Sequence, residues 1–373
     1  MSKKQKTAIV SVINDLVTDR RVDKTCMCLK EEGYRVILIG RKLKNSLPVQ
    51  HKRYETIRMR LLFRKGVLFY LEFQLRLFLL LFFKKKDLLW SNDLDTLLPN
   101  YLCSQFFSIP LVYDSHEIFC EVPELKNSPL KKKTWEFLEK KLITKNKFRI
   151  TVNESIAKWF LSKYHTTFSV IRNISDPPEF SVSKSRNELN LPSEKKIIIL
   201  QGAGINIDRG AEELVEAMHY VGDFLLLIIG SGDVIERLKL KSIKLELQDK
   251  IRFIPKLSPE ELFAFTACAD LGISIDKNTN INYQFSLPNK LFDYLHAGIP
   301  VLASRLCEIE KVILKYQVGN FIENHQPEHI AQKIVESLSH PDYENWKMNT
   351  KKIKEELNWT NEKKVLIDLI REI

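Results

Sequence analysis

One segment in the last third of the chain combines the residue types that a phosphate-binding site requires. The segment is residues 285–304, FSLPNKLFDYLHAGIPVLAS. Ser286, Leu287 and Pro288 precede a helix that we expect to begin near Asn289, so the free backbone N–H groups of its first turn can face an anion. Lys290 adds a positive charge beside them. The pattern predicts a phosphate site at a helix start.

A carboxylate follows the lysine by about one helical turn. Asp293 can accept hydrogen bonds from the hydroxyl groups of a ribose. Gly298 is expected to end the helix and Pro300 to fix the turn before the strand VLAS. On these residues alone, an ordinary capped crossover between a helix and a strand remains an alternative interpretation.

A glycine-rich turn with a basic residue forms the second candidate. In LQGAGINIDRGAEELVEAM a strand ends near Gly202 and Gly204, and Arg209 precedes a helix. Glycines let a backbone approach a diphosphate closely, and arginine can bind phosphate oxygens through two N–H groups. Gly230 begins a second strand-end glycine pair, GSGD. A solvent-exposed helix start is the alternative interpretation of Arg209.

The N-terminal half places polar residues after a different strand. VYDSHEIF puts His116 and Glu117 where the cleft residues of an open parallel sheet lie. Both side chains are therefore candidates for contact with a ligand in that cleft. A purely structural histidine is the alternative.

Further polar residues follow two other predicted strands. Asp93 lies in WSNDLD, where it is a cleft candidate or simply the cap of the next helix. Asn14, Asp15 and Arg20 occupy the first strand-to-helix turn and are candidates for contact with acceptor or phosphate. Arg20 and Arg21 could equally be a solvated pair.

The elements that must position these residues alternate between strand and helix. Apolar runs such as TAIVSVI and KKIIILQG read as buried strands, and amphipathic segments between them read as crossover helices. The fold class predicted is α/β, with two Rossmann-like, doubly wound domains that face each other across a cleft. We predict an N-terminal domain at residues 1–174 and a C-terminal domain at residues 197–355, joined by a linker at residues 175–196. The last helix, at residues 356–373, is expected to pack back on the first domain.

The segment at 285–304 resembles the donor-site signature of the family 4 (group 1) glycosyltransferases, which have the GT-B fold. Similarity extends from Ser169 to Glu323 and includes the turns at Gly202 and Gly230. The resemblance implies that the second domain binds the diphosphate and ribose of a nucleotide-sugar, with Arg209 as a phosphate ligand. It also implies retention of anomeric configuration, no required metal, and a position for His116 near the reacting sugar. We therefore predict His116 as a catalytic residue and Glu117 as a residue that orients it or binds the acceptor.

One residue departs from the family pattern. The family often carries two acids in a Glu-x7-Glu spacing, and Asp293 fits the second, but Phe285 stands in the first place. Which residue contacts the donor sugar is therefore open, with Asn282, Gln284, Asp276 or the amides near Ser286 as candidates.

Composition and charge limit the possible partners. The chain has 373 residues, 44% hydrophobic residues and a formal net charge of +11, which favours anionic partners. Lys and Arg flank the Leu- and Phe-rich window 67–83, a pattern typical of peripheral contact with an anionic membrane, although a core helix would give the same window. Glu72, Gln74 and Arg76 within it argue against a membrane span. We expect no nucleic-acid partner, no export signal, reduced cysteines and no cofactor or metal.

The function predicted is transfer of a hexose-type sugar from a nucleotide-sugar to an acceptor hydroxyl. The acceptor would be a glycan or a lipid-linked glycan of surface polysaccharide synthesis. The enzyme would be cytoplasmic and would associate with the inner face of the membrane. Alternatives are a nucleotide-sugar epimerase of the same fold and a catalytically silent nucleotide-binding subunit. A dinucleotide oxidoreductase is disfavoured because Ile207 stands where the third glycine of its motif belongs.

Overall fold

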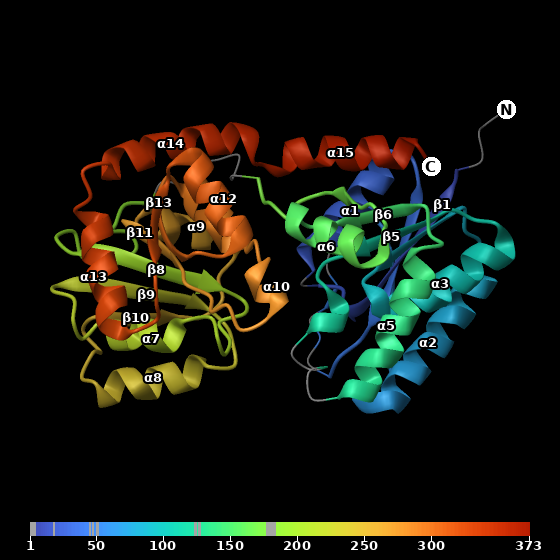
Figure 1. Ribbon diagram of the computed structural model, residues 1–373, viewed down its shortest axis with the longest axis horizontal. Coiled ribbons are helices and arrows are strands. Elements are labelled where there is room, and N and C mark those ends of the chain that lie inside the picture. Colours follow the sequence, from blue (N-terminus) through green and yellow to red (C-terminus); the bar gives the residue numbers. More distant parts are fainter. Residues whose placement is uncertain are drawn as a thin grey trace. The chain divides into compact units, whose positions relative to one another are not determined.

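The chain folds into two compact α/β units. The computed structural model describes residues 5–17, 19–44, 46, 48–49, 52–122, 125, 128–176 and 184–373. One unit comprises Met1–Asn173 with Glu362–Ile373, and the other comprises Ile174–Asn361. Each unit is described by itself (Figure 1). Residues 177–183 of the predicted linker lie outside the described residues.

The first unit is built on a parallel sheet of seven strands. Their order is β3-β2-β1-β4-β5-β6-β7, so the chain reverses its direction of winding between β1 and β4. The strands are β1 (Thr7–Asp15), β2 (Arg35–Arg41), β3 (Glu55–Met59), β4 (Leu88–Asn92), β5 (Leu111–Ser115), β6 (Phe148–Thr151) and β7 (Ser169–Val170). In open sheets of this kind, ligands bind at the carboxyl ends of the strands beside such a switch point.

Helices connect these strands as crossovers. They are α1 (Arg20–Glu31), α2 (Gly66–Phe83), α3 (Leu94–Phe107), the short 3-10 helix η1 (Phe119–Glu121), α5 (Pro129–Ile143) and α6 (Glu154–Tyr164). Asp19 caps α1 by accepting a hydrogen bond from the Val22 amide, as the sequence pattern of a polar residue before an amphipathic run favours.

The last helix, α15 (Trp359–Arg371), contributes its final residues to the first unit. Lys363 pairs with Glu31 at 2.6 Å and Arg371 with Glu32 at 2.9 Å, both at the end of α1. Glu362 accepts from the Arg172 amide at 2.7 Å. These contacts attach the C-terminus to the first sheet and its helices.

The second unit repeats the architecture with six parallel strands. Their order is β10-β9-β8-β11-β12-β13, with the switch between β8 and β11. The strands are β8 (Lys196–Gly202), β9 (Phe224–Gly230), β10 (Ile251–Ile254), β11 (Leu271–Ser274), β12 (Val301–Ser304) and β13 (Gly319–Ile322). Successive residues of β8 enter opposite cores, Ile198 and Leu200 on one face and Ile197 and Ile199 on the other, because side chains alternate along a strand.

Helices cover both faces of the second sheet (Figure 1). The core that contains Ile198 is closed by apolar residues of α7 (Ala211–Ala217), α8 (Ile235–Lys244) and α13 (Pro327–Leu338). The opposite core is closed by α9 (Pro259–Ala267), α11 (Asn289–Ala297), α12 (Cys307–Tyr316) and α14 (Tyr343–Glu356). The short helix α10 (Ile281–Gln284) precedes α11.

The predicted fold class, two Rossmann-like parallel α/β units, is confirmed. Three strands were absent from the sequence interpretation. They are β3, β7 and β13, which lie at the edges of the two sheets. These three strands are short and of mixed polarity, so no continuous apolar run marks them, whereas the fourth edge strand, β10, was predicted.

Candidate functional site

Two basic side chains from separate segments meet on one buried carboxylate in the second unit. Asp276 lies two residues beyond the end of β11 and its side chain is fully buried. Arg209 Nη1 lies 2.6 Å from Asp276 Oδ2, and Lys290 Nζ lies 3.1 Å from Asp276 Oδ1. The cations predicted from two distant motifs are thus brought together at the carboxyl end of the switch strand.

The electrostatics of this cluster favour the charged forms. Burial alone would raise the pKa of Asp276, but the charges of Lys290 and Arg209 outweigh it and hold that pKa below its usual value. The guanidinium carbon of Arg209 also lies 4.3 Å from the centre of the Tyr283 ring, a cation–π contact. Asp276 is therefore ionised and fixes the positions of both cations.

Local backbone geometry explains why a glycine follows Arg209. Gly210 has a φ of 74°, and a Cβ atom there would lie 2.3 Å from the carbonyl oxygen of Ile275. Only glycine fits both conditions. The loop that carries Arg209 is therefore packed directly against the end of β11.

Asp293, the predicted ribose ligand, lies on α11 and faces the end of β8. Its Oδ1 accepts from Ser175 Oγ at 2.9 Å and its Oδ2 from Gln201 Nε2 at 3.3 Å. Gln201 in turn accepts from Thr266 Oγ1 at 2.7 Å. Neutral polar side chains thus orient the carboxylate of Asp293.

The helix start predicted near Asn289 is present. Helix α11 begins at Asn289, follows Pro288 at its N-cap without a side-chain cap, and ends at Gly298, whose φ is 86°. Ser286 donates its amide to the Tyr283 carbonyl, and Leu287 packs on the core. Phe285 ends α10, so an apolar ring occupies the place of the family's first acid.

Packing requires a glycine at one of the predicted positions but not at another. A Cβ on Gly230 would lie 1.8 Å from the carbonyl oxygen of Gly202, so close packing of the two strand ends requires Gly230. A Cβ on Gly204 would meet only the side chain of Asn206, at 4.0 Å. Packing therefore accounts for Gly230, whereas Gly204 leaves open space at the end of β8.

In the first unit, His116 lies between two carboxylates beyond the end of β5. Its Nδ1 is 3.4 Å from Asp93 Oδ2 and its Nε2 is 3.6 Å from Asp114 Oδ2. The His116 amide donates to Asp93 Oδ1 at 2.8 Å. Burial alone would lower the pKa of His116, but the two carboxylates raise it to about 9. The imidazole is therefore positively charged at neutral pH.

Asp93 does not act as the cap that the alternative interpretation suggested. It stands at the N-cap position of α3 with a φ of 58°, yet its side chain makes no capping hydrogen bond. The side chain turns instead to His116, while burial raises the pKa of Asp93. Glu117 is exposed, and its carbonyl accepts from Ser115 Oγ at 2.8 Å.

Arg21, the second arginine of the first turn, is buried and makes structural contacts within the first unit. Arg21 is 5% exposed, lies 2.7 Å from Asp114 Oδ1 and donates to the Ile171 carbonyl at 2.6 Å. Burial works to raise the pKa of Asp114, but Arg21 and His116 lower it to about 2. The interpretation of both arginines as a solvated pair is wrong for Arg21, whereas Arg20 is exposed.

The remaining candidates of the first turn lie at the end of β1. Asn14 is exposed, and Asp15 pairs with Arg58 at 2.8 Å and accepts from the Val17 amide at 3.2 Å and from Ser46. These partners lower the pKa of Asp15 despite its burial. Asp15 is therefore already engaged within the unit, and Asn14 is the more accessible of the two.

Sequence reasoning missed the residues that orient the candidates. Gln201 and Tyr283 had no motif to mark them, because their partners are distant in sequence. The signal that existed was Asp276, a carboxylate just after an apolar strand. Among the described residues, no group of three or more His, Cys, Asp or Glu side chains is arranged to hold a metal ion.

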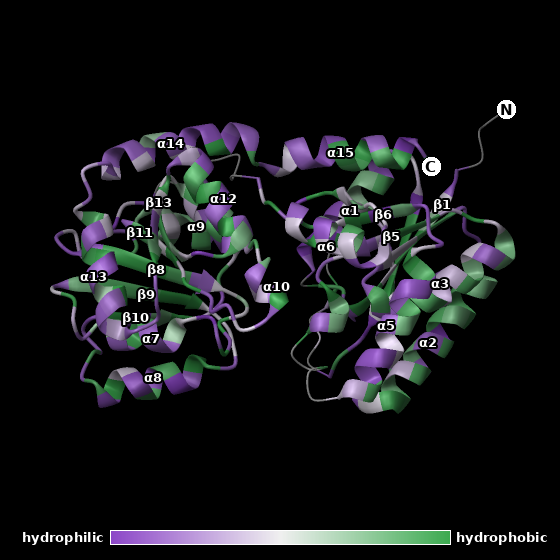
Figure 2. Cartoon of the chain, in the orientation of Figure 1, coloured by the Kyte–Doolittle hydropathy of each residue, from purple (hydrophilic) through white to green (hydrophobic). Residues whose placement is uncertain are grey.

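Helix α2 is not the core helix of the alternative interpretation. Only four of its 18 residues are buried, Phe69, Phe73, Leu77 and Leu81, and they form one stripe. Figure 2 shows the apolar character of this helix. By length and composition, α2 is also the one described helix that could cross a membrane. An exposed apolar surface thus flanks the first sheet.

Part of the chain, mostly within the second unit, matches a known family model. Residues 181–353 match the family model described as glycosyl transferases group 1. Among curated proteins, no sequence matches the chain significantly.

Solved structures resemble the whole chain. Sucrose-phosphate synthase from Thermosynechococcus elongatus is 19% identical with a TM-score of 0.81, covering 99% of both chains. HepE from Anabaena, solved in complex with UDP-glucose, is 12% identical with a TM-score of 0.76, covering 98% of this chain and 100% of its own. WaaG, a glycosyltransferase involved in lipopolysaccharide biosynthesis, is 15% identical with a TM-score of 0.74, covering 97% and 99%. The chain therefore has the GT-B fold, and its residues 181–353 match the family model of the glycosyl transferases group 1.

Proposed function

We propose that this protein transfers a glycosyl group, of hexose type, from a nucleotide-sugar to an acceptor hydroxyl. The observation that carries the proposal is the convergence of Arg209 and Lys290 on Asp276, at the carboxyl end of the switch strand of the group 1 domain. A similar fold binds UDP-glucose in HepE, which supports a nucleotide-sugar as donor. The assignment to family 4 and the retaining course of the reaction remain part of this proposal.

The donor diphosphate would be held by charge and by backbone amides. When the bond between the sugar and the diphosphate breaks, negative charge grows on the departing phosphate oxygen. Arg209, Lys290 and the uncapped first turn of α11 supply a positive field that is fixed in advance. A fixed field of this kind stabilises the transition state because the protein need not reorganise as charge develops.

The ribose and the sugar would be read by other groups. Asp293, which Ser175 and Gln201 hold in place, is the carboxylate that would accept hydrogen bonds from a ribose diol. Gly204, which packing does not require, leaves room for close approach of the donor. In the first unit, the imidazolium of His116 is a hydrogen-bond donor suited to an oxygen of the sugar.

We propose that the acceptor is a glycan or lipid-linked glycan of surface polysaccharide synthesis, met at the cytoplasmic face of a membrane. The exposed apolar face of α2 supports peripheral attachment of the first unit. Cations flank that helix, and each cation near an anionic surface contributes about 1 kcal/mol. No metal or other cofactor is required in this account.

A donor panel with a product assay tests the function. The purified chain is incubated with nucleotide-sugars, with and without membrane extract as a source of acceptor. We expect release of nucleoside diphosphate together with an extended glycan, only when acceptor is present, and loss of both in Lys290→Gln. An altered sugar released without acceptor would instead identify an epimerase, and binding without turnover of any donor would identify a silent subunit.

A further inference from the structure

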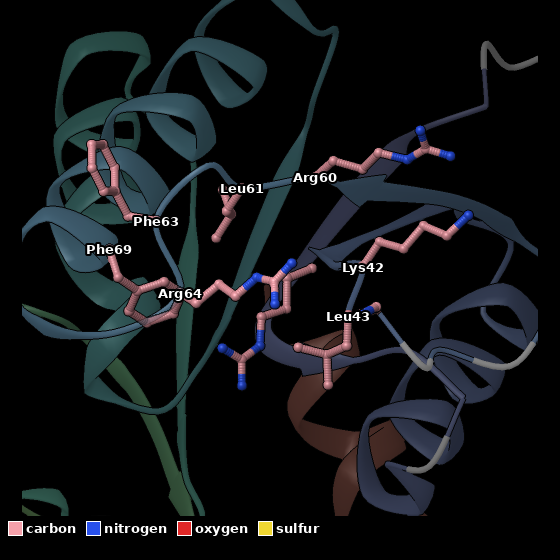
Figure 3. A pocket seen from close by; sticks show the side chains of 9 residues that line it. Lys42, Leu43, Arg60, Leu61, Phe63, Arg64 and Phe69 are labelled. Carbon is pink, nitrogen blue, oxygen red and sulfur yellow. The ribbon is translucent and has the colours of Figure 1, made fainter.

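A basic pocket in the first unit has none of the candidate residues described above in its lining, although its Arg41 pairs with Asp15 in the sheet. It has a volume of about 670 Å³ and is formed by the end of β2, the segment after β3 and the start of α2. Its lining combines cations with apolar side chains: Arg41, Lys42, Leu43, Lys44, Arg60, Leu61, Phe63, Arg64 and Phe69. In Figure 3, Phe63 and Phe69 lie on one side, Lys42 and Arg60 on the other, and Arg64 extends between them.

The positive charge of this pocket is uncompensated by its own lining. Five of the nine lining residues are cationic and none is acidic. Two nearby acids already have partners, since Glu72 pairs with Arg76 and Asp15 with Arg58, and burial raises the pKa of a third, Asp95, well above its usual value. Such a concentration of like charge in one hollow is unfavourable until an anion enters it.

Arg41 in this pocket has a buried hydrogen-bond donor that no protein group satisfies among the described residues. Its guanidinium stacks on the Phe69 ring at 5.2 Å, and its Nε is buried without a hydrogen-bond partner. A buried donor without an acceptor costs free energy, which a bound anion would recover. The guanidinium is thus positioned by the aromatic ring and still has a donor to offer.

The apolar side of the pocket continues onto α2. Phe63, just before α2, is 44% exposed, and α2 itself exposes Val67, Leu71 and Leu75 at 60% or more. The pocket therefore joins a cationic hollow to an apolar surface that extends along the helix. A ligand that fits both parts has a charged head and a hydrocarbon chain.

We propose that this pocket binds the diphosphate that joins an acceptor sugar to its lipid, with the lipid chain lying along α2. The proposal rests on the proposed function and names the acceptor class. A linking diphosphate carries two negative charges, against the single charge of a phosphodiester headgroup, and so matches five cations better. Ordinary membrane phosphodiesters are therefore expected to bind more weakly.

Calorimetry with water-soluble probes tests the site in the full chain. Farnesyl diphosphate has both parts of the expected ligand, inorganic diphosphate lacks the chain, and farnesol lacks the charge. We expect farnesyl diphosphate to bind at least tenfold more tightly than either. The double variant Lys44→Gln with Arg64→Gln, both exposed and so safe for folding, should weaken it at least tenfold.

Two single-charge variants serve as controls. Lys158→Gln removes an exposed cation on α6 of the same unit, and Lys290→Gln removes the donor-site cation, so neither should change farnesyl diphosphate binding. The proposal would be overturned if inorganic diphosphate or dihexanoyl phosphatidylglycerol bound as tightly as farnesyl diphosphate. It would also be overturned if UMP displaced farnesyl diphosphate, or if Lys158→Gln weakened its binding as much as the double variant does.

The failure of this proposal is distinguishable from failure of the proposed function. The double variant keeps the donor-site residues, so its affinity for a nucleoside diphosphate should equal that of the wild type. Absence of nucleoside diphosphate binding in the wild type would contradict the glycosyltransferase assignment, whatever the result with farnesyl diphosphate.

Discussion

Asp276 shows how one buried acid can prepare a site for an anion. Without it, Arg209 and Lys290 would repel each other, and with it they form a fixed pair of donors. A buried acid with a cation on each oxygen is costly to disturb, because removal of one partner leaves the others uncompensated.

The first prediction concerns that carboxylate. Asp276→Asn should lower the free energy of unfolding by about 3–5 kcal/mol, since it leaves two partly buried cations without their anion. Denaturant titration measures the change. Asp223→Asn, which removes an exposed partner of Lys195, is the matched control and should cost less than about 1 kcal/mol. Equal small losses in both variants would contradict a structural role for Asp276.

A second prediction follows from the raised pKa of His116. Its ordinary pKa is 6.5 and its folded pKa is about 9, so the folded state binds the proton more tightly. The resulting stabilisation is fully present below pH 6.5 and is lost as the pH rises through about 9. The stability difference between wild type and His116→Gln should therefore shrink over that interval. NMR titration of the imidazole offers a direct check, and a midpoint near 6.5 would refute the charged form.

At the level of single residues, the sequence predicted positions better than partners. His116 and Lys290 were found because they follow recognisable strand ends and helix starts. The engagement of Arg21 with Asp114 could not be foreseen, since 93 residues separate them and only the parallel order of the sheet brings them together. Arg20 and Arg21 look alike in sequence, yet one is exposed and the other buried.

At the level of elements, the turn between β8 and α7 holds Arg209 against the end of β11. Gly210→Ala should destabilise the protein by about 2 kcal/mol or more, because the added Cβ meets the Ile275 carbonyl and the positive φ is strained. It should also weaken nucleoside diphosphate binding, as Arg209 is displaced. Gly222→Ala, with nothing within 4 Å of its Cβ, should change stability by less than about 1 kcal/mol. Similar thermal unfolding of both variants would count against this packing argument.

The exposed face of α2 supports another prediction. Leu71→Gln with Leu75→Gln should reduce binding to vesicles that contain anionic lipid by at least tenfold, while the unfolding transition stays nearly unchanged, since both side chains are 60% exposed. Vesicle co-sedimentation provides the measurement. Leu240→Gln on α8, 69% exposed, is the control and should bind like the wild type. Unchanged binding of the α2 variant would exclude this face as the membrane contact.

Elements with long apolar runs were predictable, and short edge elements were not. The run IIIL in β8 marks a strand buried on both faces, whereas ETIRM in β3 and GNFI in β13 have mixed polarity. The window of α2 was predicted as apolar, but its periodicity could not tell a buried helix from one with an exposed apolar face. That difference depends on which neighbours the fold supplies.

At the level of the whole molecule, two sheets with the same order of winding place their candidate residues at equivalent positions. In each unit the candidates gather where strands end beside the switch point, at β1, β4 and β5 in one and at β8 and β11 in the other. The net charge of +11 is concentrated in part in the pocket beside α2 and in the pair Arg209 and Lys290. Both regions are suited to phosphates.

The most direct test of this account measures nucleoside diphosphate binding by calorimetry in wild type, Lys290→Gln and the exposed-lysine control Lys256→Gln. The account predicts that one of UDP, GDP or ADP binds selectively, that Lys290→Gln weakens it at least tenfold, and that Lys256→Gln leaves it unchanged. Absence of binding in the wild type, or equal affinity in Lys290→Gln, would contradict a donor site in the second unit.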